Sequence, residues 1–525
     1  MLQKSLLGRA TLISGVGIAS LLLSTLAAES TTRALTPPPA AHPITRSATT
    51  RAGVKTDATT TLIGGGATLP AIAYVGATQA TTVNPATSPA TGTVFAFVLA
   101  NNKSDAISYC QTGSGFGKKV LDGTVAANNA CAALGATATG FGAPATQAFA
   151  DFSGSDAPVA SSEYSTFATN AGNSSSPIFG RGEFVQDPYI AGAVALFYNN
   201  SSVTSQLSLS VFTLCEIADG QITNWNQIPV NPADPTGTKF ARKTLKWVYR
   251  SDSSGTTFSF SNFLSSTTST GTPHACSHTG QTYGLNMVFD PSNTTVSPAP
   301  STGVLPSPLP SGASNANFLG GNGNAGVAAC IVGSAKCTKP SGGGTATGGD
   351  GSIGYVEAAN ALNDVSGVTL DFATLLITSG STSTTVDPIK DLPAAAGLVK
   401  TTTTDKVVNA SVENGRPSPE LSAVTATTKT GCLILVDPAS YEFPTSGYPI
   451  IAVTNLEFAS AGNGAKAAVL QSLANITHIG TNFATGKITS VDPFGTSSAP
   501  VTGKTGYAEI AIPSPATTLK GCIGT

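Results

Sequence analysis

The chain has 525 residues, of which 41% are hydrophobic and only 10% are charged, and its formal net charge is −2. Globular proteins carry roughly 25% charged residues, so Gly, Pro, Ser and Thr replace charge here. The length favours two or three domains. Because no basic block stands out, the composition excludes the electrostatic footprint of a nucleic-acid-binding protein, and no nucleic-acid partner is expected.

The N-terminus has the features of an export signal. Lys4 and Arg9 precede an apolar run, residues 10–26. Small residues at the end of this run offer a cleavage site. We expect residues 1–28 to be a signal peptide. An uncleaved membrane anchor is the alternative, because the run approaches the roughly 17 residues of a membrane span. The rest of the sequence contains no comparable run, so a secreted protein is expected, periplasmic or at the extracellular surface, with no membrane span in the mature chain.

A segment rich in Thr, Ala and Pro, residues 29–57, follows the predicted signal and has no apolar periodicity. This composition is typical of a disordered arm or linker. Compact structure is expected to begin with a short strand at residues 60–63, which is followed by glycines.

Strand-like and helical patterns alternate along the rest of the chain, which is typical of α/β proteins. Further strands are predicted at residues 93–99, 191–198 and 245–249, and helices at 209–219, 256–264, 324–331 and 465–473. Stretches rich in Ser, Thr, Gly and Pro predict surface insertions at residues 265–320, 338–350 and 366–430.

Eight cysteines in an exported chain form an even set, which favours disulfides. Eight cysteines allow roughly a hundred pairings, so the sequence cannot fix the connectivity. The simplest hypothesis pairs nearest neighbours: Cys110 with Cys131, Cys215 with Cys276, Cys330 with Cys337, and Cys432 with Cys522. The stretch from His274 to His278 resembles a metal cluster, but the chain has only four His. A disulfide through Cys276 is therefore the favoured interpretation, and no metal is expected.

Three Gly-rich or polar turns are candidate anion sites. Residues 64–70 (GGGATLP) follow a predicted strand, so their glycines and the Thr68 hydroxyl could approach a ligand closely at a helix start. Residues 112–117 (TGSGFG) form a similar turn with Ser114. Residues 151–158 (DFSGSDAP) place the Asp156 carboxylate before a proline.

The fourth candidate, residues 249–258 (YRSDSSGTTF), is the strongest. A predicted strand ends in Arg250, whose guanidinium could bind an oxyanion with two prongs, and Asp252 is close enough to orient it. The helix that follows would offer hydroxyls and backbone N–H groups at its N-terminus. For any single motif an ordinary helix cap is the simpler interpretation. Four such turns in one chain favour an anion site.

These motifs, together with GSIGYVE (351–357), GRGEFVQ (180–186) and GQITNW (220–225), resemble the phosphate-binding subunits of bacterial phosphate ABC transporters. Residues 443–450 (FPTSGYPI) and 214–216 (LCE) resemble the DING family within that superfamily more closely. The resemblance spans residues 60–525 and is interrupted by the insertions. The Asp-Ile-Asn-Gly that names the DING family is replaced here by Thr61-Leu62-Ile63-Gly64.

The resemblance implies an α/β fold of the type II periplasmic-binding class, in which two α/β lobes are joined by two crossover strands and a ligand cleft lies between them. Lobe 1 would comprise residues 58–188 plus 435–525, and lobe 2 residues 189–434 with the insertions. The crossings would lie near residues 185–190 and 432–441. The ligand would be inorganic phosphate, with no cofactor and no catalytic residue. Carried over from the family, the phosphate ligands are Thr68, Leu69, Ser114, Asp156, Arg250, Ser254, Gly255 and Thr256.

Among these residues, Asp156 would explain selectivity for phosphate over sulfate. A carboxylate only accepts hydrogen bonds, so it requires a ligand that still carries a proton. Phosphate near neutral pH carries one, whereas sulfate would leave a buried carboxylate unpaired and repelled.

The main functional hypothesis is a solute-binding protein that captures phosphate, with a phosphate ABC transporter permease as a possible partner. A phosphatase-like hydrolase is one alternative, although the sequence offers neither a metal-ligand set nor enough His for a triad. The other alternative is a self-assembling structural or adhesive protein built on the same fold, with which the Thr-rich arm and the large loops are compatible.

Overall fold

The computed structural model describes most of residues 60–266, 283–289, 316–362, 371–402 and 431–474, and shorter segments at 406–408, 421–423, 506–510 and 521–525. Residues Asp57–Thr525 form one compact unit. The predicted signal peptide (1–28) and the predicted arm (29–57) lie outside the described residues, so both stay predictions.

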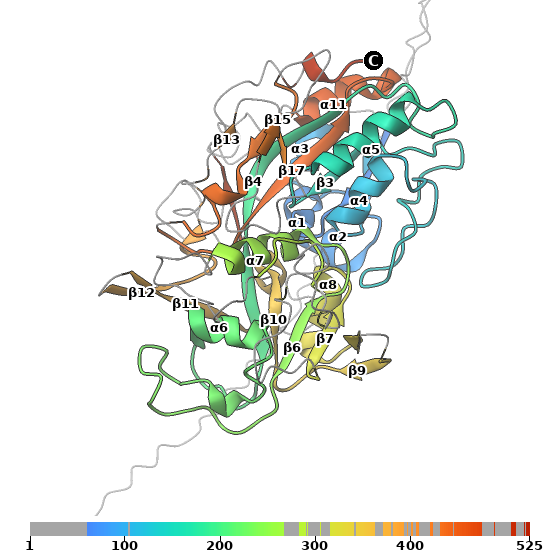
Figure 1. Ribbon diagram of the computed structural model, residues 1–525. Coiled ribbons are helices and arrows are strands. Elements are labelled where there is room, and N and C mark those ends of the chain that lie inside the picture. The colour runs from blue at the N-terminus through green and yellow to red at the C-terminus, as the bar shows by residue number, and fades with distance from the viewer. Residues whose placement is uncertain are drawn as a thin grey trace, which may run out of the picture. The chain divides into compact units, whose positions relative to one another are not determined.

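A large mixed sheet lies at the centre of this unit (Figure 1). Its first part contains three parallel strands, with β1 (Thr61–Gly66) between β2 (Ala106–Gln111) and β3 (Phe152–Ser155). β17 (Ile451–Ala459) pairs antiparallel with β3. The strand predicted at the start of the compact structure is therefore confirmed as β1.

The strand β4 (Phe184–Asn199) connects the two parts of the sheet. Its residues 184–193 pair with β17, and residues 194–199 pair with β10 (Ser352–Glu357). Two predicted strands are confirmed, one inside β4 and the other as β6. Beyond β10 the sheet continues with β6 (Lys246–Arg250), β7 (Phe318–Gly321), β8 (Lys336–Thr338) and β9 (Thr345–Thr347).

The strands beside the two halves of β4 come from different parts of the chain. Beside the first half, β17 and the strands beyond it belong to residues 61–155 and 451–459, and β18 (Tyr507–Glu509) pairs with β4 residues 190–192 on the edge opposite β17. Beside the second half, β10 and the strands beyond it belong to residues 246–357, and a strand at residues 371–379 pairs with β4 residues 196–198 on the edge opposite β10. The two predicted lobes, their boundaries and the two crossings stay predictions.

Several helices begin directly after strands. α4 (Ser114–Leu121) follows β2, α7 (Gly255–Ser266) follows β6, and α8 (Gly323–Val332) follows β7. Within the described ranges, no helix is both long and apolar enough to cross a membrane. The other helices are α1 (Ala71–Val75), α2 (Ala77–Thr82), α3 (Val94–Asn101), α5 (Ser161–Gly172), α6 (Val211–Ala218), α9 (Ala358–Leu362), α11 (Ala467–Ala474), and the 3-10 turns Trp225–Gln227, Pro438–Ser440 and Gly464–Lys466.

All four predicted helices are confirmed, as α6, α7, α8 and α11, with ends shifted by a few residues. The strand predicted at residues 93–99 is wrong, because this segment forms the helix α3. Thr93 caps the helix by accepting from the Ala96 N–H at 3.4 Å. Phe95 is buried and stacks on Tyr74 with ring centroids 4.7 Å apart. The tertiary packing therefore outweighs the strand propensity of the β-branched and aromatic residues.

All three predicted insertions contain regular structure. Residues 265–320 include the end of α7 and most of β7, and much of the rest of this range lies outside the described residues. Residues 338–350 contain β9. In residues 366–430, β11 (Asp371–Ser379) pairs with β4 and with β5 (Ser208–Ser210), so this part is built into the sheet rather than lying on the surface. The remaining short strands are β12 (Thr382–Val386), β13 (Thr401–Thr402), β14 (Lys406–Val408), β15 (Leu421–Ala423) and β16 (Leu435–Val436).

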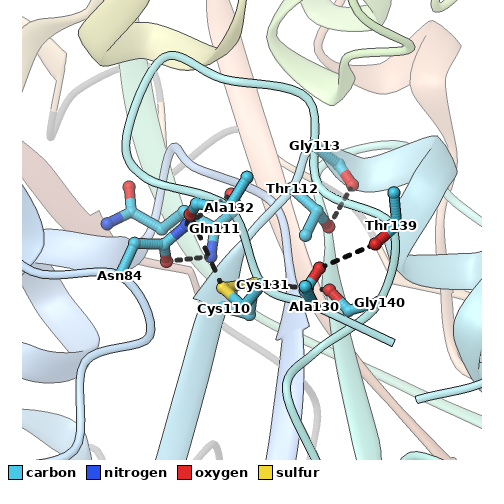
Figure 2. The surroundings of a disulfide bond; sticks show 10 residues. All are labelled: Asn84, Cys110, Gln111, Thr112, Gly113, Ala130, Cys131, Ala132, Thr139 and Gly140. Atoms are coloured by element: carbon cyan, nitrogen blue, oxygen red, sulfur yellow. Dashed lines mark hydrogen bonds between the residues drawn. A yellow bond between two sulfur atoms is a disulfide. The ribbon is translucent and has the colours of Figure 1, made fainter. Parts of the chain in front are cut away.

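Three of the four predicted disulfides are present: Cys110–Cys131, Cys330–Cys337 and Cys432–Cys522. Cys215 is also disulfide-bonded, but its predicted partner Cys276 lies outside the described residues. Figure 2 shows the first bridge, which ties the end of β2 to the loop after α4. Beside it, the Asn84 side chain donates to the Ala132 carbonyl at 2.7 Å and accepts from the Gln111 N–H at 2.8 Å.

The Cys432–Cys522 bridge should stabilise the fold more than Cys330–Cys337. The two pairs are 90 and 7 residues apart in sequence. In the chain-entropy model this corresponds to roughly 4–5 against roughly 2–2.5 kcal/mol. We expect the double Cys→Ser replacement at 432 and 522 to lower the free energy of unfolding by about 2 kcal/mol more than the matched replacement at 330 and 337. Urea unfolding followed by circular dichroism measures both losses, and equal losses would contradict this expectation.

Candidate functional site

The first group of predicted ligands lies at the ends of the three parallel strands. The turn after β1 carries Thr68 and Leu69, α4 begins at Ser114 shortly after β2, and Asp156 directly follows β3. Because carboxyl ends of parallel strands meet at the same edge of a sheet, these turns come together. All four residues are buried.

The second group lies between β6 and α7. Arg250 is the last residue of β6, Ser254 immediately precedes α7, and Gly255 and Thr256 open that helix. All four are buried, whereas Asp252 in the same loop is partly exposed. The backbone N–H of Gly115, in α4, donates to the Ser253 carbonyl at 3.1 Å, which fixes this loop against the first group.

Ser114 joins the two groups directly. Its Oγ accepts from the backbone N–H of Asp156 and from that of Gly255, both at 3.1 Å. A Cβ on Gly255 would lie 2.5 Å from this oxygen, so only glycine permits the approach. With two bonds accepted, the Ser114 hydroxyl still has its own proton, which stabilises the carboxylate of Asp156. The Gly255 N–H, which we expected to face an anion, is already bonded within the protein.

The other three predicted hydroxyls also accept from protein donors. Thr68 Oγ1 accepts from the Asn324 N–H at 3.3 Å, and Ser254 Oγ accepts from the Thr257 N–H at 3.2 Å. Thr256 Oγ1 accepts from Arg250 Nη1 at 3.1 Å. Among the described residues, none of these three hydroxyls donates to a protein acceptor. Each therefore keeps one proton for a ligand.

Arg250 is held on several sides. Its Nε and Nη2 donate to the two carboxylate oxygens of Asp252 at 2.8 and 2.5 Å, as the predicted orienting role requires. Its Nη1 donates to Thr256 and, at 2.9 Å, to the Asn324 Oδ1. A guanidinium has five N–H groups, so this arrangement leaves one for a ligand rather than the predicted two. Burial alone would lower the pKa of Arg250, but Asp252 raises it overall, so the cation is retained.

Asp156 is a buried carboxyl with a raised pKa. Burial raises the pKa to about 7, while the Thr454 hydroxyl, Arg250 and Ser114 partly offset this effect. The Thr454 Oγ1 donates to Asp156 Oδ1 at 2.9 Å. Near neutral pH this carboxyl is therefore present in both protonation states, and the carboxylate form accepts hydrogen bonds only.

The sequence interpretation missed two residues that complete the network. Thr454 belongs to β17, and the polar residues Thr454, Asn455 and Glu457 inside this buried strand were a signal of a buried polar function. Asn324 was interpreted only as the start of a predicted helix, yet it contacts both Arg250 and Thr68. Its place in a Gly-Asn-Gly-Asn run after a strand resembles the other candidate turns.

No metal centre is found in the part of the chain that the structure describes: it brings no three His, Cys, Asp or Glu side chains together in a way that could hold an ion. The His274–His278 stretch lies outside the described residues.

The family assignment comes from a comparison with known proteins. A family model described as a PBP superfamily domain matches residues 52–417, which is more than half of the chain, so the chain belongs to this superfamily. The solved structure of the ancestral soluble variant of the Human Phosphate Binding Protein matches 88% of this chain and 99% of its own, with a TM-score of 0.50 and 23% identity. The predicted type II periplasmic-binding fold class is confirmed. The superfamily that the motifs predicted is thereby confirmed, and the closer resemblance to the DING family stays a prediction.

Curated relatives carry two kinds of name. Alkaline phosphatase L of Pseudomonas aeruginosa (strain UCBPP-PA14) is 26% identical over 283 residues, which are 53% of this chain and 55% of that protein. Phosphate-binding protein PstS 3 of Mycobacterium leprae (strain TN) is 32% identical over 114 residues, which are 22% of this chain and 28% of that protein. The chain therefore spans less than two thirds of the length of either relative.

The bond from Thr454 to Asp156 can be tested by replacing Thr454 with Val, which keeps the size but removes the hydroxyl. Because this bond stabilises the carboxylate, we expect the pKa of Asp156 to rise further above its value of about 7, by roughly one pH unit. Carbon-13 NMR titration of labelled aspartate carboxyls measures it. Thr454→Ser keeps the donor and should leave the pKa nearly unchanged. An unchanged pKa in Thr454→Val would show that the bond does not stabilise the carboxylate.

Proposed function

We propose that the chain is a secreted solute-binding protein that captures inorganic phosphate in a cleft between two lobes. The observation that carries this proposal is the set of three buried hydroxyls that accept from protein donors and whose own protons have no acceptor among the described residues. They belong to Thr68, Ser254 and Thr256. Such a set fits a compact ligand with several acceptor oxygens.

Phosphate fits this set better than sulfate. Most of the polar groups around the site donate, but the carboxylate form of Asp156 accepts only. A ligand that carries a proton can donate it to Asp156, whereas fully deprotonated sulfate would face an unpaired carboxylate. The family resemblance implied eight phosphate ligands, and these hydroxyls and Asp156 are among them. PstS 3 and the Human Phosphate Binding Protein are named for phosphate.

A hydrolase is the competing function, since one relative is named Alkaline phosphatase L. The candidate nucleophile among the predicted ligands beside Asp156 is Ser114. Its oxygen accepts from two backbone N–H groups, so its lone pairs are engaged and are poorly available for attack on phosphorus. We therefore propose a binding protein that is not an enzyme.

Secretion is supported by the disulfides, which persist in oxidising compartments. A binding protein of this kind would deliver phosphate to an ABC transporter permease, which is the partner we propose. The alternative of a self-assembling extracellular protein would keep the fold without needing this delivery.

The selectivity can be measured by calorimetry with phosphate and sulfate. At about pH 9, where the Asp156 carboxyl with its pKa of about 7 is almost fully ionised, we expect the wild-type protein to prefer phosphate by at least ~100-fold, a gap of roughly 2.7 kcal/mol. Asp156→Asn removes the charge and adds a donor, so sulfate binding should improve relative to phosphate. Arg250→Ala should weaken both anions, because the lost donor does not distinguish them. An unchanged ratio in Asp156→Asn would make Asp156 a structural carboxyl, and a wild type that binds neither anion would overturn the proposed function.

The pH dependence provides a second test of Asp156. The pKa of Asp156 is about 7, so below that pH the protonated carboxyl can donate to sulfate. Above it, the wild-type affinity for sulfate should fall roughly tenfold per pH unit, because only the shrinking protonated fraction binds. Asp156→Asn should abolish this slope. A wild-type sulfate affinity that is constant from pH 6 to 9 would contradict the assignment.

The hydrolase alternative predicts turnover. We expect purified wild-type protein to release no more product from p-nitrophenyl phosphate than Ser114→Ala does. Activity that follows the protein through purification and disappears in Ser114→Ala would overturn the binding-only proposal. Phosphate calorimetry on the same two proteins measures whether Ser114→Ala also loses affinity for phosphate.

A further inference from the structure

Asn324 has an unusual environment at the start of α8. Its side chain is only 1% exposed, and it lies among residues that we assign to the phosphate site. Its Oδ1 accepts from Arg250 Nη1 at 2.9 Å, and its backbone N–H donates to Thr68 Oγ1 at 3.3 Å. Asn324 therefore connects a residue of the first group to a residue of the second.

The orientation of the Asn324 amide is fixed by chemistry. A guanidinium has donors only, so the atom that faces Arg250 must be the amide oxygen. The Nδ2 consequently points away from Arg250 and cannot exchange places with the oxygen. Among the described residues, this buried Nδ2 has no hydrogen-bond partner.

A buried amide NH2 without an acceptor is unfavourable, so it needs a partner that the protein itself does not supply. The neighbouring hydroxyls of Thr68 and Thr256 have the same need, since each keeps a proton with no protein acceptor. One ligand with several acceptor oxygens would satisfy all three. Thr68 and Thr256 are family-implied ligands, whereas Asn324 was not among them.

We propose that Asn324 is a further ligand of the bound phosphate and that its Nδ2 donates to a phosphate oxygen. This inference rests on the proposed function. The amide acts as a neutral donor: it strengthens binding of oxyanions in general, whereas Asp156 distinguishes phosphate from sulfate. Its Oδ1 simultaneously holds Arg250, so the residue binds the ligand and orients a second donor.

The decisive variant is Asn324→Asp, measured by phosphate calorimetry at pH 8. This replacement keeps the size and an acceptor for Arg250 but exchanges the Nδ2 donor for a carboxylate oxygen. If Asn324 donates to phosphate, the affinity should fall by at least ~100-fold because a donor is lost and a charge repels the anion. It should recover as the pH is lowered and the introduced carboxyl takes up a proton. If the affinity of Asn324→Asp stays within about threefold of wild type, the Asn324 side chain does not face the ligand, which would overturn the proposal.

Asn463→Asp is the matched control for the effect of burying a charge. Asn463 is also buried, and its Nδ2 donates to the Ala459 and Gly524 carbonyls away from the site. We expect this variant to lose stability but keep its phosphate affinity. An equal loss of affinity in both variants would attribute the effect to general destabilisation and overturn the proposal.

Two further measurements distinguish a failure of this inference from a failure of the proposed function. Asn324→Ala should weaken phosphate and sulfate by similar factors and leave their ratio unchanged, in contrast to Asp156→Asn. In wild type, the Asn324 side-chain NH2 signal in nitrogen-15 NMR should shift when phosphate is added, and a static signal in the presence of bound phosphate would overturn the inference. If wild type binds no phosphate at all, the proposed function fails first.

Discussion

The candidate site depends on the hydroxyl of Ser114, which accepts from two backbone N–H groups that belong to distant parts of the chain. One belongs to Asp156 after β3, and the other belongs to Gly255 at the start of α7. This contact needs a residue without Cβ at 255, because a side chain there would overlap both Ser114 and Asp156. Together with the bond from the Gly115 N–H to the Ser253 carbonyl, this contact holds the two groups of candidate ligands against each other.

The charges of the candidate site explain why anion binding there would depend on hydrogen-bond donors more than on net positive charge. Arg250 is paired with both oxygens of Asp252, and Asp156 adds a second carboxyl. The site therefore offers an anion no excess of positive charge. The donors that remain are the hydroxyls, the backbone N–H groups at the start of α7 and the Asn324 amide. Such fixed dipoles interact strongly with an anion where water is excluded. The Arg250–Asp252 pair also keeps a buried cation satisfied before any ligand arrives.

The sequence predicted the eight candidate ligands and most of the elements that carry them, because short motifs with glycines and hydroxyls at strand ends have a strong local signature. It could not predict that Gly255 and Arg250 would use their donors within the protein, since that depends on the distance between turns that are far apart in the chain. Thr454 was missed for the same reason: it meets Asp156 only through the antiparallel pairing of β17 with β3. At residues 93–99, packing against Tyr74 favoured a helix over the strand that local propensity predicted.

One physical cause connects the raised pKa of Asp156 with the proposed choice of ligand. Burial without excess positive charge disfavours the ionised carboxyl, so its pKa is raised to about 7. The same environment disfavours any second negative group that brings no proton with it. A proton shared between Asp156 and the ligand relieves both penalties at once. The Thr454 hydroxyl counteracts the rise by stabilising the carboxylate, which keeps Asp156 an acceptor in part of the population near neutral pH. A protonated oxyanion is therefore the ligand that this arrangement accommodates best.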